Sequence, residues 1–136
     1  MKIKLDSHGI LPTRAHATDA GLDLYSPVNM TIGAGKYRRI NTGVHVQLPK
    51  GTAGFIKSKS GLMSKYGITT DGTIDEGYTG EIGVVLFNRG QQSYRVKQYD
   101  KIAQLVVVPV LYPSVEPTGT LDGSERGNKG FGSTGR

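Results

Sequence analysis

The sequence predicts one all-β domain, and three observations support that prediction. Apolar and polar residues alternate along several short stretches, as they do in strands that cover a core with one face. Turn-forming residues separate these stretches at short intervals. Only residues 61–66 suggest a helix, with Ser60 in the N-cap position. Many short strands with almost no helix indicate a sandwich, a jelly roll or a barrel.

Four stretches are predicted as strands. Residues 2–5 alternate between polar and apolar. Residues 39–48 alternate over a longer stretch and predict a half-buried strand. One face of that strand carries Ile40, Thr42, Val44, Val46 and Leu48. Residues 81–87 and 102–111 are rich in β-branched and apolar residues and predict two further strands. Turn signals lie at residues 26–27, 33–35, 49–51, 71–72, 88–90 and 99–100.

The stretch at residues 102–111 does not alternate, because Val106, Val107 and Val108 follow one another. Such a run predicts a strand that is covered on both faces. In a chain of this size, a neighbouring subunit is one explanation for the second cover. A central strand wholly inside one sandwich fits the same pattern.

Length and composition limit the classes of protein to consider. The 136 residues fit one domain, predicted at residues 1–122, followed by a tail at residues 123–136. The chain has no cysteine, which excludes disulfides, thiol nucleophiles and cysteine metal sites and fits a reducing cytoplasm. The first residues lack a signal-peptide layout, and the longest apolar run is too short for a bilayer. The net charge of +6 is dispersed, so direct binding of polymeric nucleic acid is not expected.

The tail at residues 126–136 is rich in glycine but carries selected chemistry. Arg126 and Lys129 can neutralise an anion, and Ser133 and Thr134 can donate hydroxyl hydrogen bonds. Phe131 is flat enough to stack on a base. These residues predict a lid that orders over a phosphorylated aromatic ligand. A disordered terminus without a ligand is the alternative.

Four other segments combine residues suited to a ligand site: 17–24, 58–62, 72–80 and 101–105. The first places Asp19 and Asp23 around a glycine, and the second is a candidate anion site at a helix start. The third carries one acid and one aromatic in a glycine-punctuated hairpin, and the fourth sets Gln104 in an apolar strand. Taken singly, each segment has a structural explanation as a turn, a helix cap or a half-exposed strand.

Together with the tail, these segments resemble in order and spacing the five motifs of the trimeric deoxyuridine triphosphatase (dUTPase) family. The resemblance covers residues 17–135. Two positions depart from the family pattern, because Lys59 stands where the second motif normally has Arg, and Lys101 stands where the fourth often has Arg. Lysine offers a point charge rather than a bidentate fork to a phosphate.

The resemblance implies a β jelly roll that forms a homotrimer with sites shared between subunits. It implies hydrolysis of dUTP to dUMP and pyrophosphate, which limits uracil in DNA and supplies dUMP for thymidylate synthesis. Asp75 would be the catalytic base, and Asp23 would hold a water of a bound Mg²⁺. The residues that would bind substrate are Lys59, Ser60, Gly61, Gly72, Ile74, Tyr78, Gly83, Gln104, Arg126, Phe131, Gly132, Ser133 and Thr134.

The resemblance also implies how the substrate would be selected. Backbone groups around Gly72 and Gly83 would pair with the uracil edge, and cytosine would present the opposite donors there. The Tyr78 ring would lie under the deoxyribose and leave no room for a 2′-hydroxyl.

Three other functions remain to be distinguished. One is a deoxycytidine triphosphate deaminase of the related fold; a zinc-type deaminase is excluded, because cysteine is absent and the three histidines lack ligand spacing. Another is a non-catalytic nucleotide sensor or repressor-binding protein, since phage relatives of the family bind regulatory partners. The third is a basic β-domain that binds nucleic acid. Measuring pyrophosphate and ammonia from each deoxynucleotide with Mg²⁺ would separate them.

Overall fold

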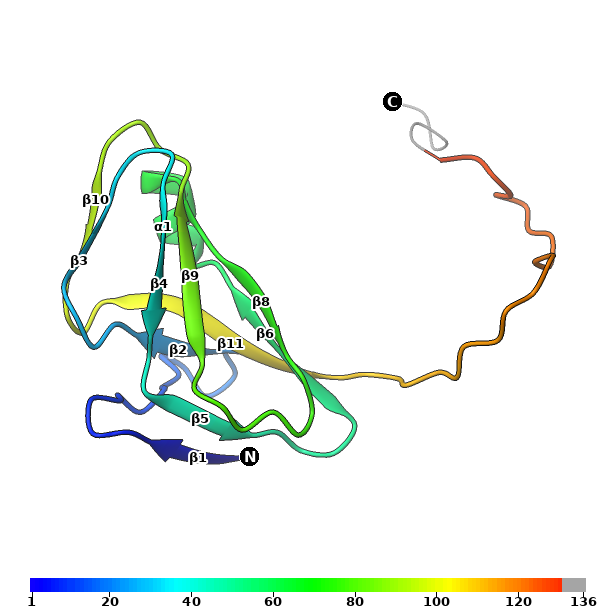
Figure 1. Ribbon diagram of the computed structural model, residues 1–136, viewed down its shortest axis with the longest axis horizontal. Coiled ribbons are helices and arrows are strands. Elements are labelled where there is room, and N and C mark those ends of the chain that lie inside the picture. The colour runs from blue at the N-terminus through cyan, green and yellow to red at the C-terminus, as the bar shows by residue number, and fades with distance from the viewer. Residues whose placement is uncertain (131–136) are drawn as a thin grey trace.

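The computed structural model describes residues 1–130 and confirms the predicted all-β fold (Figure 1). The strands are β1 (Lys2–Leu5), β2 (Gly21–Tyr25), β3 (Met30–Ile32), β4 (Tyr37–Asn41), β5 (Val44–Gln47), β6 (Thr52–Lys57), β7 (Ile68–Thr69), β8 (Asp71–Ile74), β9 (Gly83–Asn88), β10 (Tyr94–Val96) and β11 (Lys101–Pro109). One short helix, α1 (Ser60–Tyr66), lies between β6 and β7. This arrangement of sandwiched sheets with a short helix matches a jelly roll.

The strands form four small antiparallel sheets. The largest has the order β2-β11-β6-β8, and a second has the order β4-β9-β7. Two-stranded sheets join β1 to β5 and β10 to β3. In Figure 1, β4 and β9 run across the β2-β11-β6-β8 sheet, while β1 and β5 lie at one end of the body and β3 and β10 at the other. No helix among residues 1–130 is long and apolar enough to span a membrane.

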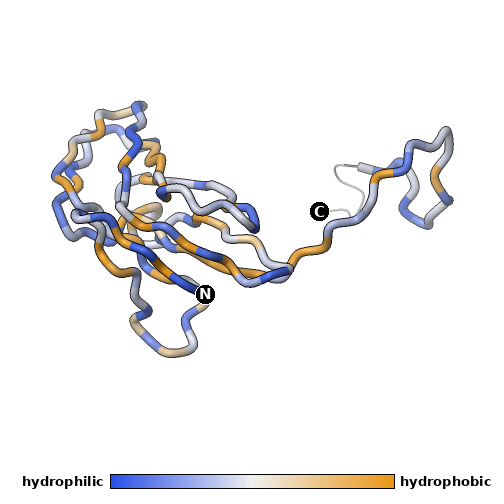
Figure 2. Tube along the Cα trace, turned by 60° about the horizontal axis from the view of Figure 1, so that its bottom comes forward, coloured by the Kyte–Doolittle hydropathy of each residue, from blue (hydrophilic) through white to orange (hydrophobic). Residues whose placement is uncertain are grey.

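One apolar core fills the space between the sheets. Each of the larger sheets contributes alternate residues to it, as expected for strands with one face inward. Figure 2 shows the resulting mixture of hydrophobic and hydrophilic residues along the strands. The largest fully buried side chains are Leu24, Ile32, Ile40, Val44, Val46, Ile68, Ile82, Val84, Leu86, Val96, Ile102 and Leu105.

The long strand predicted at residues 39–48 divides into β4 and β5, although its predicted inner face is buried as expected. The break falls at Gly43, whose φ of 69° lies in the left-handed region. A side chain there would also collide with the backbone of Gly9. At the same corner, Thr42 Oγ1 donates to the Ile82 carbonyl at 2.8 Å. The chain therefore leaves β9 after Asn41 and pairs with β1 from Val44 onward.

The helix begins one residue earlier than predicted, and Ser60 is not its N-cap. Lys59 occupies the cap position with extended dihedral angles, and its side chain makes no capping hydrogen bond. Its carbonyl instead accepts the amide of Met63 at 2.9 Å. The helix ends at Gly67, whose left-handed conformation lets its amide reach back to the carbonyls of Leu62 and Met63.

The valine run lies on β11, the second strand of the largest sheet. Leu105 faces the core and is fully buried, whereas Val106 and Val108 on the opposite face are only half-buried. The outer face of β11 is therefore partly uncovered in a single chain. A strand wholly inside one sandwich does not fit this exposure, and a cover by a neighbouring subunit stays a prediction.

Beyond β11 the chain runs away from the body as an exposed segment without strands or helices through residue 130 (Figures 1 and 2). Its root is attached by two hydrogen bonds. The Val110 amide donates to the Gly51 carbonyl at 2.9 Å, and the Tyr112 hydroxyl donates to the Glu76 carboxylate at 2.8 Å. The predicted division at residues 122 and 123 falls within this exposed segment and stays a prediction.

Candidate functional site

A polar pocket of about 360 Å³ lies at the β2 edge of the largest sheet. It gathers residues from three of the predicted motifs, because β2, β11 and the end of β6 are neighbours. Asp23 on β2 and Gln104 on β11 are direct cross-strand partners, so their side chains share the outer face. The pocket is lined by Ala15, Asp19, Ala20, Gly21, Asp23, Lys59, Lys101, Gln104 and Val106.

Asp23 is the centre of this pocket. Its side chain is 8% exposed, and it accepts one hydrogen bond from the ammonium of Lys59 and another from Lys101, the latter at 2.8 Å. Burial is the largest single influence and would raise the pKa of the carboxyl, but the hydrogen bonds and charges of the two lysines together hold that pKa below its usual range. Asp23 is therefore a buried, ionised carboxylate.

Lys101 lies outside the predicted substrate-binding set, although it belongs to the fourth motif. Gln104 lies three positions further along the strand, and simple strand alternation would put the two side chains on opposite faces. An irregularity in the pairing of β11 with β2, between Lys101 and Ala103, shifts the alternation by one residue, so Lys101 and Gln104 face the same side of the sheet. Ile102 and Ala103 are consequently both buried, and Lys101 turns toward Asp23, which raises the pKa of its ammonium.

Gln104 is held by its surroundings. Its side-chain amide donates to the Ser58 carbonyl at 3.2 Å, and its aliphatic part lies directly over Gly21. A Cβ at Gly21 would stand 2.9 Å from the Gln104 Cβ, so no larger residue fits there without moving Gln104. Ser60 and Gly61 follow Lys59 on the exposed first turn of α1 and are not part of the pocket lining.

The formal charges of the pocket cancel. Asp19 and Asp23 contribute two negative charges, and Lys59 and Lys101 contribute two positive ones. A ligand with several negative charges would therefore need further cations to be neutralised. A metal ion bridging its phosphates, or basic groups from elsewhere, would supply them.

The second predicted group of residues lies at the opposite edge of the same sheet. Asp75 follows the last residue of β8 and is exposed, and Tyr78 stands in the turn that leads toward β9. The Tyr78 hydroxyl donates to the Glu81 carbonyl at 3.1 Å, which folds the ring over Gly80.

Two backbone edges in this region have no strand partner within residues 1–130. β8 is the edge strand of its sheet and pairs only with β6, through Gly72 and Ile74 among others. β9 pairs with β4 along its length but with β7 only at Phe87 and Asn88. Its first residues, starting at Gly83, therefore keep one edge unpaired. Such edges offer amides and carbonyls to a ligand in the way a strand does.

The two groups of residues are far apart in one chain. Asp71, Lys57, Gln104 and Asp23 stand level with one another across the sheet. Asp75 is four residues beyond Asp71 along β8 and three strands away from Asp23. These offsets correspond to about 13 Å along the strand and about 14 Å across the sheet. One phosphate cannot touch Asp75 and the Asp23 pocket of the same chain.

Only part of the predicted lid is described. Arg126 is exposed, and its guanidinium donates to the Lys129 carbonyl at 3.1 Å, away from both groups of site residues. Phe131, Gly132, Ser133 and Thr134 lie outside the described residues.

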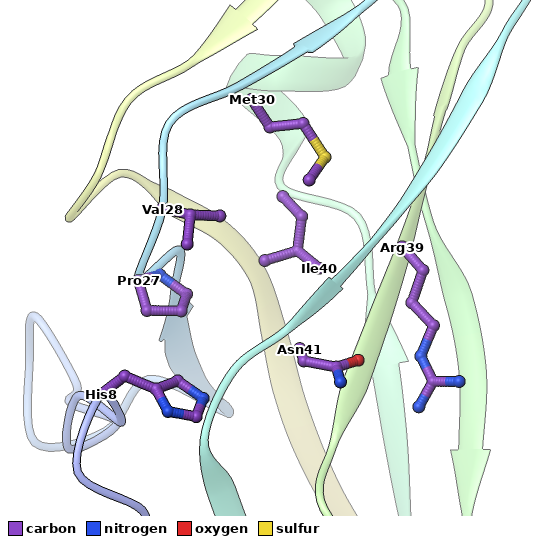
Figure 3. A pocket seen from close by; sticks show the side chains of 7 residues that line it. All are labelled: His8, Pro27, Val28, Met30, Arg39, Ile40 and Asn41. Carbon is purple, nitrogen blue, oxygen red and sulfur yellow. The ribbon is translucent and has the colours of Figure 1, made fainter.

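A separate groove of about 410 Å³ contains none of the predicted site residues. It lies where the chain after β2 passes beside β4, and Figure 3 shows that its wall is largely apolar. It is lined by His8, Pro27, Val28, Met30, Arg39, Ile40 and Asn41.

The fold and the pocket define the class of protein: a jelly-roll protein with a polar pocket in which two carboxylates face two ammonium groups. The family model that matches this chain is that of dUTPase, over residues 7–135. The chain belongs to the dUTPase family.

Individual relatives agree with this assignment. The deoxyuridine 5′-triphosphate nucleotidohydrolase of Trichodesmium erythraeum is 47% identical over 135 residues, covering 97% of this chain and 95% of that protein. The dUTPase of Staphylococcus bacteriophage 80alpha, solved with dUPNHPP, superimposes with a TM-score of 0.92 at 32% identity, covering 99% and 98% of the two chains. It is described as controlling the transfer of virulence genes.

A third relative bears on metal binding. A mutant dUTPase from phage phi11 of S. aureus superimposes with a TM-score of 0.80 at 27% identity, covering 88% of this chain and 96% of that one. Its structure describes the coordination of a structural Mg(II) ion.

Proposed function

We propose that this chain hydrolyses dUTP to dUMP and pyrophosphate. The observation that carries the proposal is the pocket around Asp23, where residues of the first, second and fourth motifs of a dUTPase-family chain meet. Limiting uracil in DNA and supplying dUMP for thymidylate synthesis would follow from this activity.

Lys59, Gln104 and the exposed start of α1 at Ser60 and Gly61 would bind the phosphates. Both lysines of the pocket are anchored on Asp23, so their ammonium groups are already positioned before a ligand arrives. Lysine contacts a phosphate as a point charge, and the lost bidentate geometry of arginine would be offset by this anchoring.

The donor set fits Mg²⁺ that is held mainly by phosphates and water. Each carboxylate oxygen of Asp23 accepts one hydrogen bond from a lysine and can accept a second from a metal-bound water. Bound in this way, the ion would supply the positive charge that the balanced pocket lacks.

Asp75 would be the general base that orients and deprotonates the attacking water. Its exposed position at the end of an edge strand gives it access to a ligand lying along β8. General-base catalysis typically increases a reaction rate by a factor of about 10²–10⁴.

The nucleoside would bind between the unpaired edges of β8 and β9. Backbone groups of Gly72, Ile74 and Gly83 would pair with the uracil edge, and a cytosine would leave buried donors and acceptors unpaired. Tyr78, fixed by its hydrogen bond to Glu81, would pack against the deoxyribose.

The complete site would be shared by chains of a homotrimer. The separation between Asp75 and the Asp23 pocket supports this arrangement, and so does the half-covered outer face of β11. The tail, with Arg126, Phe131, Gly132, Ser133 and Thr134, would close over the substrate from a further chain. Its basic residues would add to the charge on the phosphates.

The decisive experiment supplies each deoxynucleoside triphosphate with Mg²⁺ and measures pyrophosphate and ammonia. We expect pyrophosphate from dUTP alone and no ammonia. Asp75→Asn should bind dUTP but lose most turnover. Ammonia from dCTP would establish the deaminase instead, and an Asp75→Asn variant within about threefold of wild type would remove Asp75 from its role.

Mixed chains test the shared site. Asp75→Asn and Lys59→Ala chains, each inactive alone, should recover part of the activity when they are unfolded and refolded together. Recovery requires that one intact Asp75 and one intact Lys59 meet across an interface. No recovery, with light scattering giving a monomer mass, would contradict the trimer.

A regulatory protein partner is a second candidate function, favoured by the similarity to the 80alpha dUTPase. If the chain is phage-borne, we expect such a partner to bind independently of catalysis. Binding that survives in Asp75→Asn would support this role.

A further inference from the structure

His45 lies where three segments of the body meet. It stands on β5, opposite Lys4 of β1, and its side chain is 18% exposed. The ring Nδ1 lies 2.8 Å from the backbone carbonyl oxygen of Thr79, and Nε2 lies 3.0 Å from a carboxylate oxygen of Asp6. The ring thus connects the segment after β1 with the turn between β8 and β9.

Both partners of the ring accept hydrogen bonds and cannot donate them. A neutral imidazole has one donor nitrogen, so it can make only one of these two hydrogen bonds. The imidazolium has two donors and makes both. Both contacts can therefore be hydrogen bonds at the same time only when His45 is doubly protonated.

The segment held through Thr79 is the one that carries the proposed nucleoside site. Tyr78 directly precedes Thr79, and the turn begins at Asp75, whose carbonyl accepts the Tyr78 amide at 3.1 Å. Residues 75–79 are all exposed, so packing contributes little to their position. A tether from a half-buried ring is correspondingly more important here than in the core.

We propose that His45 is a positioning residue of the nucleoside site: as an imidazolium it joins the Thr79 carbonyl to the Asp6 carboxylate and holds the turn that carries Tyr78. This inference rests on the proposed placement of the nucleoside at β8 and β9.

The charges around the ring determine when the tether exists. Asp6 comes from the segment after β1, and Lys4 and Lys2 come from β1 itself. On the hairpin side, Glu81 pairs with His8, and both groups lie within 4.8 Å of the Asp6 carboxylate. The hydrogen bonds to Asp6 and Thr79 raise the pKa of His45, while burial and Lys4 oppose the increase.

The raised pKa of His45 determines whether the tether is lost at low or at high pH. Because the folded pKa lies above the unfolded value of about 6.5, the tether is complete below pH 6.5 and is lost as the pH rises through the folded pKa. The KM for dUTP should therefore rise with pH through that range, while kcat changes less.

The test combines kinetics with the titration of the ring. In the full chain, the ring signals of His45 should titrate above pH 6.5 in NMR spectra, and the Thr79 region should shift with them. His45→Ala should raise the KM for dUTP at pH 6.5 by about three- to tenfold with little change in kcat. His45→Gln, which can donate to Thr79 without a charge, should restore part of the affinity and show a KM independent of pH.

A second variant keeps the result interpretable. Asp6→Asn replaces His45→Ala if the latter does not fold, and it should lower the pKa of the ring. A wild-type KM with wild-type pH dependence in the His45 or Asp6 variant would overturn the proposal. Absence of dUTP turnover in the wild type would refute the proposed function, whereas the NMR titration tests the tether by itself.

Discussion

Replacing Asp23 by asparagine removes the carboxylate that anchors both lysines of the Asp23 pocket. Asp71→Asn is the matched control, because Asp71 lies level with Asp23 on the same face of the same sheet and pairs with Lys57 at 2.6 Å. The two pairs differ in burial. The Asp23 side chain is 8% exposed, and that of Asp71 is 76% exposed.

Burial sets the expected magnitudes. Removing one partner of a fully buried ion pair costs about 3–5 kcal/mol, but Lys59 and Lys101 are partly exposed and can turn to water. We therefore expect Asp23→Asn to lower the free energy of unfolding by about 2–3 kcal/mol. The exposed Asp71 pair should contribute much less, because solvent screens it. For a chain of this length, the loss expected for Asp23→Asn corresponds to a decrease in Tm of about 6–15 °C.

Thermal and urea unfolding at one fixed protein concentration, followed by circular dichroism, measure both variants. The folded pKa of Asp23 lies below the unfolded value of about 3.9, so its contribution is complete above that pH and disappears as the pH falls through the folded pKa. The difference between wild type and Asp23→Asn should therefore be constant above pH 5 and shrink in acid. Equal effects of the two substitutions would refute this account of the pocket.

Three further outcomes follow from the proposed site. Tyr78→Ala should lower the ratio of kcat/KM for dUTP over UTP while dCTP is still rejected, and an unchanged ratio would remove Tyr78 as the sugar gate. Deletion of residues 126–136 should leave the Tm without ligand nearly unchanged, because the described part of this segment is exposed. The same deletion should reduce dUTP turnover severely, and normal turnover would exclude a lid. Gly21→Ala should displace Gln104, raise the KM for dUTP and cost about 1–3 kcal/mol in urea unfolding. Gly61→Ala, where a Cβ meets nothing within 4 Å, should not lower stability.

The sequence predicted most of what depends on local patterning. Alternation identified the buried face of residues 40–48 correctly, since burial of every second side chain follows from strand geometry alone. It did not predict the break at Gly43, because the alternation continues across the corner while the hydrogen-bonding partner changes from β9 to β1. That change depends on contacts with Gly9 and Ile82, which are distant in sequence.

The candidate site, too, could be predicted only in part from the sequence. The motifs named Asp23, Lys59 and Gln104, and the structure brings all three into one pocket. Lys101 was recognised only as a departure from the family pattern, and strand alternation alone would place it opposite Gln104. The irregularity next to Ala103 reverses that placement, and it is defined by the register with β2 rather than by any residue type in β11.

The charge balance of the pocket explains why so many separate elements would take part in one reaction. A rigid pocket with excess positive charge would bind the pyrophosphate product as well as the substrate and would slow product release. Here Asp19 and Asp23 offset Lys59 and Lys101, so under the proposed function the additional positive charge would come from groups that can leave, namely Mg²⁺ and the basic residues of the tail. The pocket would then position the phosphates, while the groups that neutralise them would arrive and depart with each turnover.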